Sequence, residues 1–388
     1  MPRDEGSLAP VRARWSARRV LATLHLVLGI ALGIPLVLIG LSGSILVFED
    51  QLHDWFDPPS PAMTVGDRRP ITDVVDAARA IVATTASPTL VLLPEALDKP
   101  VVVRFAVRGE AGGPGAIAVS VDPVSLRTFG PDRPGEHWLR QVFNLHAQLF
   151  VQGRDGRWLI GWFGIAMVIL GFSGMVMWWP RRAPFVSALR VDRRKRGAPL
   201  LRDIHETVGL WLWFVFIAVS GSSVYLAYPE TVGEAVRAVL PGRDLRLITA
   251  PRVTPSPAPI SLDQAIAAAR AAVPDGSLRM IGLPQRGDQP LRVNFAPPGH
   301  FPGTPMVGVF VEPGTSRVLE IRDPRQFTAG ETVLAWQHAV HAGDGFGWLW
   351  RILVFVSGLL PAVFVGTGVA HWILRRRGRN RARPTAAL

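Results

Sequence analysis

The sequence contains no cysteine among its 388 residues. Disulfide bonds, iron–sulfur clusters, zinc sites with thiolate ligands and cofactors attached through a C-x-x-C-H motif are therefore excluded. Any metal centre in this protein must use His, Met or carboxylate side chains as its ligands.

Motifs that bind nucleotides or catalytic zinc are also missing. Neither G-x-G-x-x-G nor G-x-x-x-x-G-K-[ST] follows a predicted strand, so these motifs provide no site for NAD, flavin or ATP. His205-Glu206 begins like the zinc motif H-E-x-x-H, but the second His is absent. If the protein carries out redox chemistry, its electrons must come from another molecule.

Charged residues are scarce: they make up 19% of the chain, against about 25% in a typical soluble domain. Hydrophobic residues make up 48%, and the mean hydropathy is +0.25. The apolar residues form four stretches of at least 21 residues, at 20–48, 158–179, 208–228 and 348–374. Each stretch can cross an apolar layer about 30 Å thick. The first lacks a signal-peptide cleavage pattern, so the sequence predicts a mainly α membrane protein with four transmembrane helices.

The positive charge is confined to three segments between and beyond the apolar stretches. The net charge is +12, and residues 1–19, 180–204 and 375–388 together hold nineteen basic residues and only four acidic ones. All three segments lie on one side of a four-span topology, so the positive-inside rule places them in the cytoplasm. Because the rest of the chain carries no positive excess, we expect no nucleic-acid partner.

These patterns predict the organisation of the whole chain. Residues 49–157 and 229–347 are too polar to enter a bilayer, and each contains a helical run (71–81, 260–273) and strand-like runs (101–107 and 118–123; 291–295 and 309–313). We expect a basic cytoplasmic tail at 1–19, spans at 20–48, 158–179, 208–228 and 348–374, small extracytoplasmic α+β modules at 49–157 and 229–347, a basic cytoplasmic loop at 180–207 and a basic cytoplasmic tail at 375–388.

The two halves of the chain resemble each other. His25-x-x-x-Gly29 in the first span has a counterpart in His205-x-x-x-Gly209 in the third, and each is followed by Ser-Gly-Ser, at 42–44 and 220–222. His146 leads into the second span and His341 into the fourth. The repeated unit is helix, module, helix, twice in the same orientation, which implies a pseudo-twofold axis along the membrane normal.

The duplication arranges four histidines as two pairs. His25 and His205 are expected near the cytoplasmic face, and His146 and His341 near the outer face. A twofold axis brings equivalent residues face to face, as two imidazoles approaching one iron from opposite sides require. Gly29 and Gly209 lie four residues after a His, on the same helical face, and leave room for a flat macrocycle. The alternative is that these are ordinary histidines at a membrane interface.

Two further histidines compete with these four. His371, one turn from the inner end of the fourth span, has Met177 as its repeat counterpart. It could replace an inner ligand, bind a macrocycle carboxylate or serve a third site. His338 lies one turn before His341 and competes with it as an outer ligand. His53, His137 and His300 are predicted to be surface residues.

A set of these motifs resembles a known family. His25-x-x-x-Gly29 with Leu41-Ser42-Gly43, Leu145-His146 with Gly153 and Gly156, Trp178-Trp179-Pro180-Arg181, His205-x-x-x-Gly209 and Val340-His341-Ala-Gly343 are similar to the pattern of PepSY-associated transmembrane proteins. The resemblance extends from about Arg14 to Arg377. It implies periplasmic PepSY modules, b-type haem held by membrane histidines, a bacterial inner-membrane location and a role in iron uptake like that of ferrisiderophore reductases.

The resulting hypothesis is an oxidoreductase, a haem b electron conduit with two haems. His25 and His205 ligate the iron of the inner haem, and His146 and His341 that of the outer one, which passes electrons to an Fe(III)-siderophore in the periplasm. Siderophore oxygens bind Fe(II) less strongly than Fe(III), so one electron releases the metal. The donor is a quinol or a cytoplasmic flavoprotein. Alternatives are a non-catalytic PepSY scaffold that binds a periplasmic partner, and a siderophore or iron permease.

The catalytic residues are not identified by any motif, but the substrate must meet the protein where spans two and four reach the modules. Polar and aromatic residues at this position are Trp138, Gln141 and Asn144 before the second span and Trp336, His338 and Asp344 before the fourth. Trp138, His338 and Asp344 are the candidate substrate contacts. The alternative is that the Trp residues form an interfacial belt.

Overall fold

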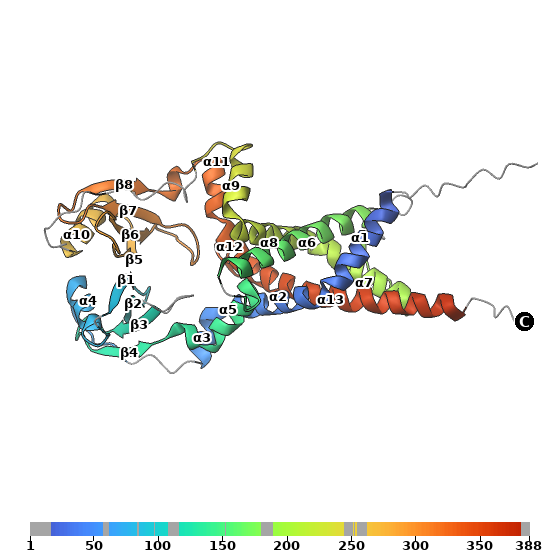
Figure 1. Ribbon diagram of the computed structural model, residues 1–388, viewed down its shortest axis with the longest axis horizontal. Helices are drawn as coiled ribbons and strands as arrows, with labels where there is room; N and C mark the ends of the chain where they lie inside the picture. The colour runs from blue at the N-terminus through green and yellow to red at the C-terminus, as the bar shows by residue number, and fades with distance from the viewer. Residues whose placement is uncertain are drawn as a thin grey trace, which may run out of the picture.

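A bundle of long helices and an eight-stranded sheet lie at opposite ends of the molecule (Figure 1). This computed structural model describes residues 17–56, 62–83, 85–96, 98–107, 116–151, 153–179, 189–243, 251, 253 and 262–381. Much of the three basic segments, at 1–16, 180–188 and 382–388, and the first residues of the helical run at 260–273 lie outside the described residues.

Among the described residues, two helices are long and apolar enough to cross a membrane: α6, Arg154–Trp178, and α13, Gly347–Arg381. Two further spans are possible if each of two bent helix pairs crosses once. The first pair is α1, Ala17–Ala31, with α2, Gly33–Leu46, bent by 66°. The second is α7, Ala198–Trp211, with α8, Trp213–Ala227, bent by 67°. Part of the predicted cytoplasmic loop at 180–207 is therefore helical, because α7 begins at Ala198.

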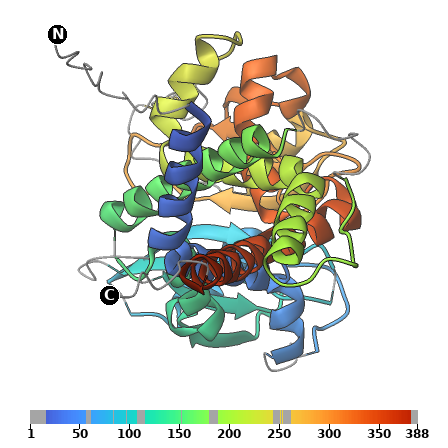
Figure 2. The ribbon, with the colours of Figure 1, turned by 90° about the vertical axis from the view of Figure 1, so that its right-hand side faces the viewer.

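The two bends occur at Leu32 and Leu212, which are 180 positions apart. At the first bend, Pro35 has no N–H to donate to the carbonyl of Ala31, and its ring crowds that carbonyl. No proline accompanies the second bend, where the indole of Trp213 donates to the carbonyl of Gly171 at 3.1 Å and ties α8 to α6. Figure 2, seen from the helical end, shows α1 lying across the bundle while α13 is viewed along its axis.

Short helices connect the bundle to the sheet. α3 and α9 begin directly after the first and second bent pairs, and α5 and α12 carry the second pair of predicted ligands. Their bounds are α3 Glu49–Phe56, α5 Trp138–Gln148, α9 Pro229–Arg237, α11 Ala329–Ala335 and α12 Gln337–Ala342, with 3-10 turns η1 Pro134–Glu136 and η3 Pro324–Gln326.

The two modules share one antiparallel sheet with the order β4-β3-β2-β1-β5-β6-β7-β8. Its strands are β1 Ala86–Leu92, β2 Val101–Val107, β3 Ala116–Val121, β4 Thr128–Asp132, β5 Ser277–Gly282, β6 Leu291–Ala296, β7 Val307–Val311 and β8 Val318–Arg322. β2 and β6 lie in segments that the sequence predicts to be strands. The sequence does not predict that β1 pairs with β5, as Val91 does with Ile281, and so joins the two halves. This pairing satisfies two strands that would otherwise be open sheet edges.

The main hydrophobic core lies between the sheet and two helices on one of its faces, α4, Ile71–Arg79, and α10, Leu262–Ala272. Alternation along the strands explains it: Val103 and Phe105 are fully buried, while Arg104 between them is exposed on the opposite face. That opposite face is turned toward the helical bundle (Figure 1).

Asp122, just after β3, organises its turn. Its carboxylate accepts hydrogen bonds from the Thr64 backbone N–H at 2.8 Å, the Thr64 hydroxyl at 2.6 Å and the Val124 N–H at 2.9 Å. Burial alone would raise the pKa of Asp122, but these hydrogen bonds together hold it well below its ordinary value. The stability that the carboxylate contributes is therefore fully present above its ordinary pKa of about 3.9 and is lost as the pH falls below it.

Asp122→Ala should lower the free energy of unfolding by about 2 kcal/mol at neutral pH, because several backbone and hydroxyl donors lose their acceptor. The difference from the parent should shrink below about pH 4. Denaturant unfolding in detergent, followed by tryptophan fluorescence, measures both effects. Asp76→Ala, which removes an exposed carboxylate 3.9 Å from Arg79, should change the stability by less than about 0.5 kcal/mol. Equal losses for the two variants would contradict the assignment.

Candidate functional site

His25 and His205 face each other within the helical bundle. His25 lies on α1 and His205 on α7, and the centres of their rings are 6.3 Å apart. The Nδ1 of His25 is 2.8 Å from the hydroxyl of Ser173 on α6, and the Nδ1 of His205 is 2.9 Å from the hydroxyl of Thr367 on α13. Each ring is thus held to the protein through Nδ1, and no hydrogen bond to its Nε2 occurs among the described residues.

His146 and His341 form a second pair, on α5 and α12, with ring centres 5.9 Å apart. Here the partners of Nδ1 are main-chain carbonyls. His146 lies 2.9 Å from the oxygen of Ile39 on α2, and His341 lies 3.1 Å from the oxygen of Val219 on α8. A carbonyl only accepts, so each Nδ1 carries the proton and donates it. The lone pair of each ring is then on Nε2.

The partners of the two pairs are related by the duplication. Ile39 and Val219 are 180 positions apart, as are His25 and His205. Ser42 and Ser222, whose hydroxyls lie 3.5 and 3.2 Å from the Nδ1 atoms of the outer pair, have the same spacing. Judged by these contacts, Ser42 is equivalent to Ser222. The Ser-Gly-Ser motif would instead align Ser42 with Ser220, two positions earlier.

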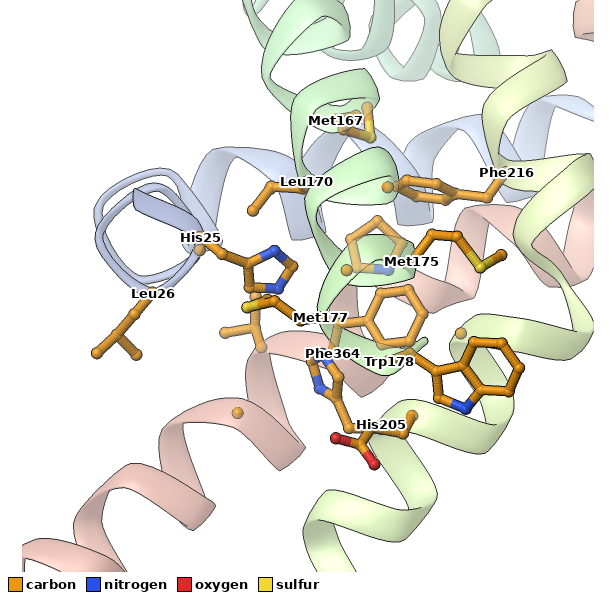
Figure 3. A pocket seen from close by; sticks show the side chains of 18 of the residues that line it. His25, Leu26, Met167, Leu170, Met175, Met177, Trp178, His205, Phe216 and Phe364 are labelled. Carbon is orange, nitrogen blue, oxygen red and sulfur yellow. The ribbon is translucent and has the colours of Figure 1, made fainter. Parts of the chain in front are cut away.

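A cavity of about 250 Å³ lies beside the inner pair. Figure 3 shows His25 and His205 entering it from different helices. Five glycines form part of its wall, three from the first half and two from the second: Gly29, Gly171, Gly174, Gly209 and Gly368. A Cβ added at Gly29 would meet no atom within 4 Å, and one added at Gly174 would lie 3.5 Å from the Cε1 of His25. The missing side chains keep space open next to both imidazoles.

The two sides of this cavity differ in chemistry. Phe364 lies 4.9 Å from His205 and 6.1 Å from Phe216, between ring centres. The positions that correspond to Phe216 and Phe364 in the first half hold Leu36 and Leu170, which line the same cavity. At these two positions the second half contributes aromatic rings and the first half aliphatic side chains, so the two halves are not strictly symmetric at this site.

The arrangement of the four histidines fits haem. A metal bound about 2 Å from each of two facing imidazole nitrogens would separate the ring centres by roughly 6 Å. A metal-binding His commonly donates its other N–H to an oxygen. His146 and His341 do so here through Nδ1, and the Nδ1 atoms of His25 and His205 also contact oxygens. Among the described residues no group of three or more His, Asp or Glu side chains is placed to hold a metal ion. Two protein ligands at each level suit a metal whose other ligands come from a macrocycle.

The competing histidines are placed differently. His371 on α13 contacts the Ala198 carbonyl at 2.8 Å and is not among the residues that line the cavity. His53 and His137, predicted to be surface residues, are 6.4 Å apart between ring centres. However, the Nε2 of His137 is bound to Asp132 at 3.0 Å. Ring separation alone therefore does not identify a ligand pair, and an anchored Nδ1 alone does not either, because the Nδ1 of His371 also contacts a carbonyl. The four histidines are distinguished by having both an anchored Nδ1 and a facing imidazole.

The predicted substrate contacts Trp138 and Asp344 have different surroundings. Trp138 is 44% exposed and its ring centre is 5.8 Å from that of Phe56 on α3. Asp344 follows α12, next to Gly303 of the loop between β6 and β7. Burial raises the pKa of Asp344, although the nearby Arg351 opposes this effect.

The remaining residues of this set have structural contacts. Gln141 donates to the Gly135 carbonyl at 3.1 Å, and Trp336 packs on Phe346 with 5.3 Å between ring centres. His338 lies close enough to His341 and Asp344 to influence their charges. In the part of the chain that the structure describes, no hydrogen bond, ion pair or ring contact joins Trp138, Gln141 or Asn144 to Trp336, His338 or Asp344. The helices alone therefore do not gather these side chains into one substrate pocket.

Comparison with protein families gives one match. A family model described as the PepSY-associated TM region matches residues 22–375. Among curated proteins, none matches the chain.

Proposed function

Because the chain belongs to the PepSY-associated transmembrane family, which confirms the resemblance seen in its motifs, we propose that it is a haem b electron conduit that reduces Fe(III)-siderophores. One observation carries the proposal: two pairs of repeat-related histidines face each other at two levels, and each ring is anchored through Nδ1. A non-catalytic scaffold or a permease would not require histidines in this arrangement.

The proposed topology has four spans, with each bent pair crossing once, and both termini in the cytoplasm of a bacterium. The start of α1 and the end of α13 lie at the end of the molecule farthest from the sheet (Figure 1). Arg18 and Arg19 begin α1, and Arg375 to Arg377 lie near the end of α13. The positive-inside rule then supports a periplasmic sheet and an inner-membrane location.

In this proposal His25 and His205 hold the inner haem, and His146 and His341 the outer one. Haem supplies a one-electron iron couple when it is bound. The protein's own contribution is to orient the ligands: Ser173 and Thr367 fix the inner rings, and the carbonyls of Ile39 and Val219 fix the outer ones. Donation from Nδ1 keeps the Nε2 lone pair available and raises its basicity.

The apolar wall of the inner cavity contributes a second effect. Leu36, Phe216 and Phe364 line it together with other apolar side chains, and they exclude water from the space beside the histidines. A low-dielectric surround changes the relative stability of the two charge states of a bound iron, so these side chains tune the reduction potential. The electron donor in this proposal is a quinol or a soluble flavoprotein.

The proposed electron acceptor is an Fe(III) chelate, which receives its electron at the outer side, near His146 and His341. Oxygen donors bind Fe(II) less strongly than Fe(III), so a single electron loosens the metal without breaking the chelator. Trp138, His338 and Asp344 flank this region and are the proposed substrate contacts. The protein then acts as an oxidoreductase whose product is Fe(II).

The test uses the purified, chemically reduced protein. Adding an Fe(III)-siderophore should reoxidise its haem at least about tenfold faster than adding the Ga(III) complex of the same chelator, because Ga(III) accepts no electron under these conditions. Stopped-flow absorbance of reduced haem b measures the rate. If the Fe(III) and Ga(III) complexes act alike, or if the pure protein contains no haem, the proposed function is wrong.

A further inference from the structure

The sheet face turned toward the helical bundle carries two arginines over one aromatic ring. The guanidinium carbon of Arg322 lies 4.4 Å from the ring centre of Phe310, and that of Arg292 lies 5.7 Å away. Arg292 on β6 is paired in register with Phe310 on β7, which is paired with Glu320 on β8. Three adjacent strands therefore build the cluster Arg292, Asn294, Phe310, Glu320 and Arg322.

The charges in this cluster are not balanced. Glu320 binds Arg322 with two hydrogen bonds, at 2.8 and 3.2 Å. Arg292 donates from Nε to the side-chain oxygen of Asn294 at 3.1 Å, but this partner is neutral. Among the described residues no carboxylate forms an ion pair with Arg292. Burial by neighbouring atoms and then the charge of Arg322 lower the pKa of Arg292, although part of its side chain is exposed to solvent.

The duplication shows that the fold does not require this cluster. In the first half, Val102 is paired with Ser120 and Ala118 with Asp132. In the second half, the equivalent pairs are Arg292 with Phe310 and Gly308 with Arg322. The same antiparallel strands thus carry Val102, Ser120 and Asp132 where the second half has Arg292, Phe310 and Arg322. The fold does not require these side chains, and the two arginines among them carry like charges that repel each other. Their gathering in one cluster therefore indicates an anionic ligand.

We propose that Arg292, together with Asn294, Phe310 and Arg322, binds the anionic groups of the Fe(III) chelate, so that the substrates are negatively charged chelates with carboxylate or catecholate oxygens. This inference rests on the proposed function, because it names the substrate class of that reaction. A guanidinium offers parallel N–H donors that match two carboxylate oxygens, and the ring of Phe310 holds both guanidinium groups in place. Arg292 and Asn294 alternate with the core residues Leu291, Val293 and Phe295, so they lie on the sheet face opposite α4 and α10. That face of the sheet is turned toward the helical bundle (Figure 1).

The experiment measures binding without electron transfer. Isothermal titration of the full-length protein in detergent with Ga(III)-citrate, an anionic complex that is not reduced, should give saturable binding. Arg292→Val, which installs the residue of the first half, should raise the Kd at least about tenfold. The matched control is Arg104→Val, which removes the same charge from the same sheet face on β2 and should change the Kd by less than about twofold.

The outcomes separate this inference from the proposed function. Retained haem content and an unchanged near-UV circular dichroism spectrum establish that Arg292→Val is folded. No binding of Ga(III)-citrate to the parent, equal weakening by both substitutions, or an unchanged Kd for Arg292→Val would overturn the inference. Since Ga(III) binding requires no electron, these results do not depend on whether the reduced haem is reoxidised by Fe(III) chelates.

Discussion

Replacing His205 with Ala should remove one of the two haems and leave the other with an unchanged low-spin spectrum. The reason is that His205 faces His25 at 6.3 Å between ring centres and, in the proposed function, provides half of the protein ligands of the inner haem. The pyridine haemochrome assay on purified protein should fall from about two haems per chain to about one. His146→Ala should have the reverse effect, with loss of the outer haem.

The matched control for His205→Ala is His371→Ala. His371 is the same residue type at the same end of the bundle, but it contacts the Ala198 carbonyl and does not line the cavity. This variant should retain both haems. The ligand assignment would be refuted if His205→Ala kept two haems or if His371→Ala lost one. Loss of one haem in His371→Ala would indicate that His371 is an inner ligand.

Gly29→Leu should also remove the inner haem, although both inner histidines remain. A side chain at Gly29 grows into open space, since an added Cβ meets no atom within 4 Å, and this space belongs to the cavity beside His25 and His205. Filling an empty cavity does not by itself destabilise a protein. The variant should therefore unfold no more easily than haem-free parent protein, while its haem content falls by about half.

The matched control is Gly221→Leu on α8. An added Cβ at Gly221 also meets nothing within 4 Å, and the equivalent position of the first half, 180 residues earlier, is already Leu41. This variant should keep both haems. If Gly29→Leu keeps both as well, the open space at Gly29 is not part of a cofactor site, and the cavity needs another explanation.

The pairing of the histidines was accessible from the sequence because the two halves repeat. His25 and His205 occupy equivalent positions, and so do His146 and His341, and a twofold axis brings equivalent residues together. The anchors of the outer rings were not accessible in the same way. The carbonyls of Ile39 and Val219 belong to the main chain. Every residue of an apolar helix has such a carbonyl, so the sequence does not indicate which ones accept these hydrogen bonds. Only the crossing of α5 over α2, and of α12 over α8, selects them.

The arginine cluster on the sheet illustrates the same limit. The alternation in β6 correctly turns Arg292 and Asn294 away from the core. Their nearness to Phe310 and Arg322 depends on the register between three strands, and a shift of one residue would place different side chains opposite each other. The sequence therefore contains these residues without indicating that they form a cluster.

The sequence by itself determined the apolar stretches, the duplication, the family and the four equivalent histidines. Each of these depends on composition or spacing along the chain, to which helix length and burial in a bilayer respond directly. The tertiary structure alone decided that β1 pairs with β5 to make one sheet, that Trp213 bonds to α6 where the second pair bends, and that His371 lies outside the inner cavity. These features are contacts between residues distant in the sequence, which depend on the packing of whole elements and leave no local pattern to read.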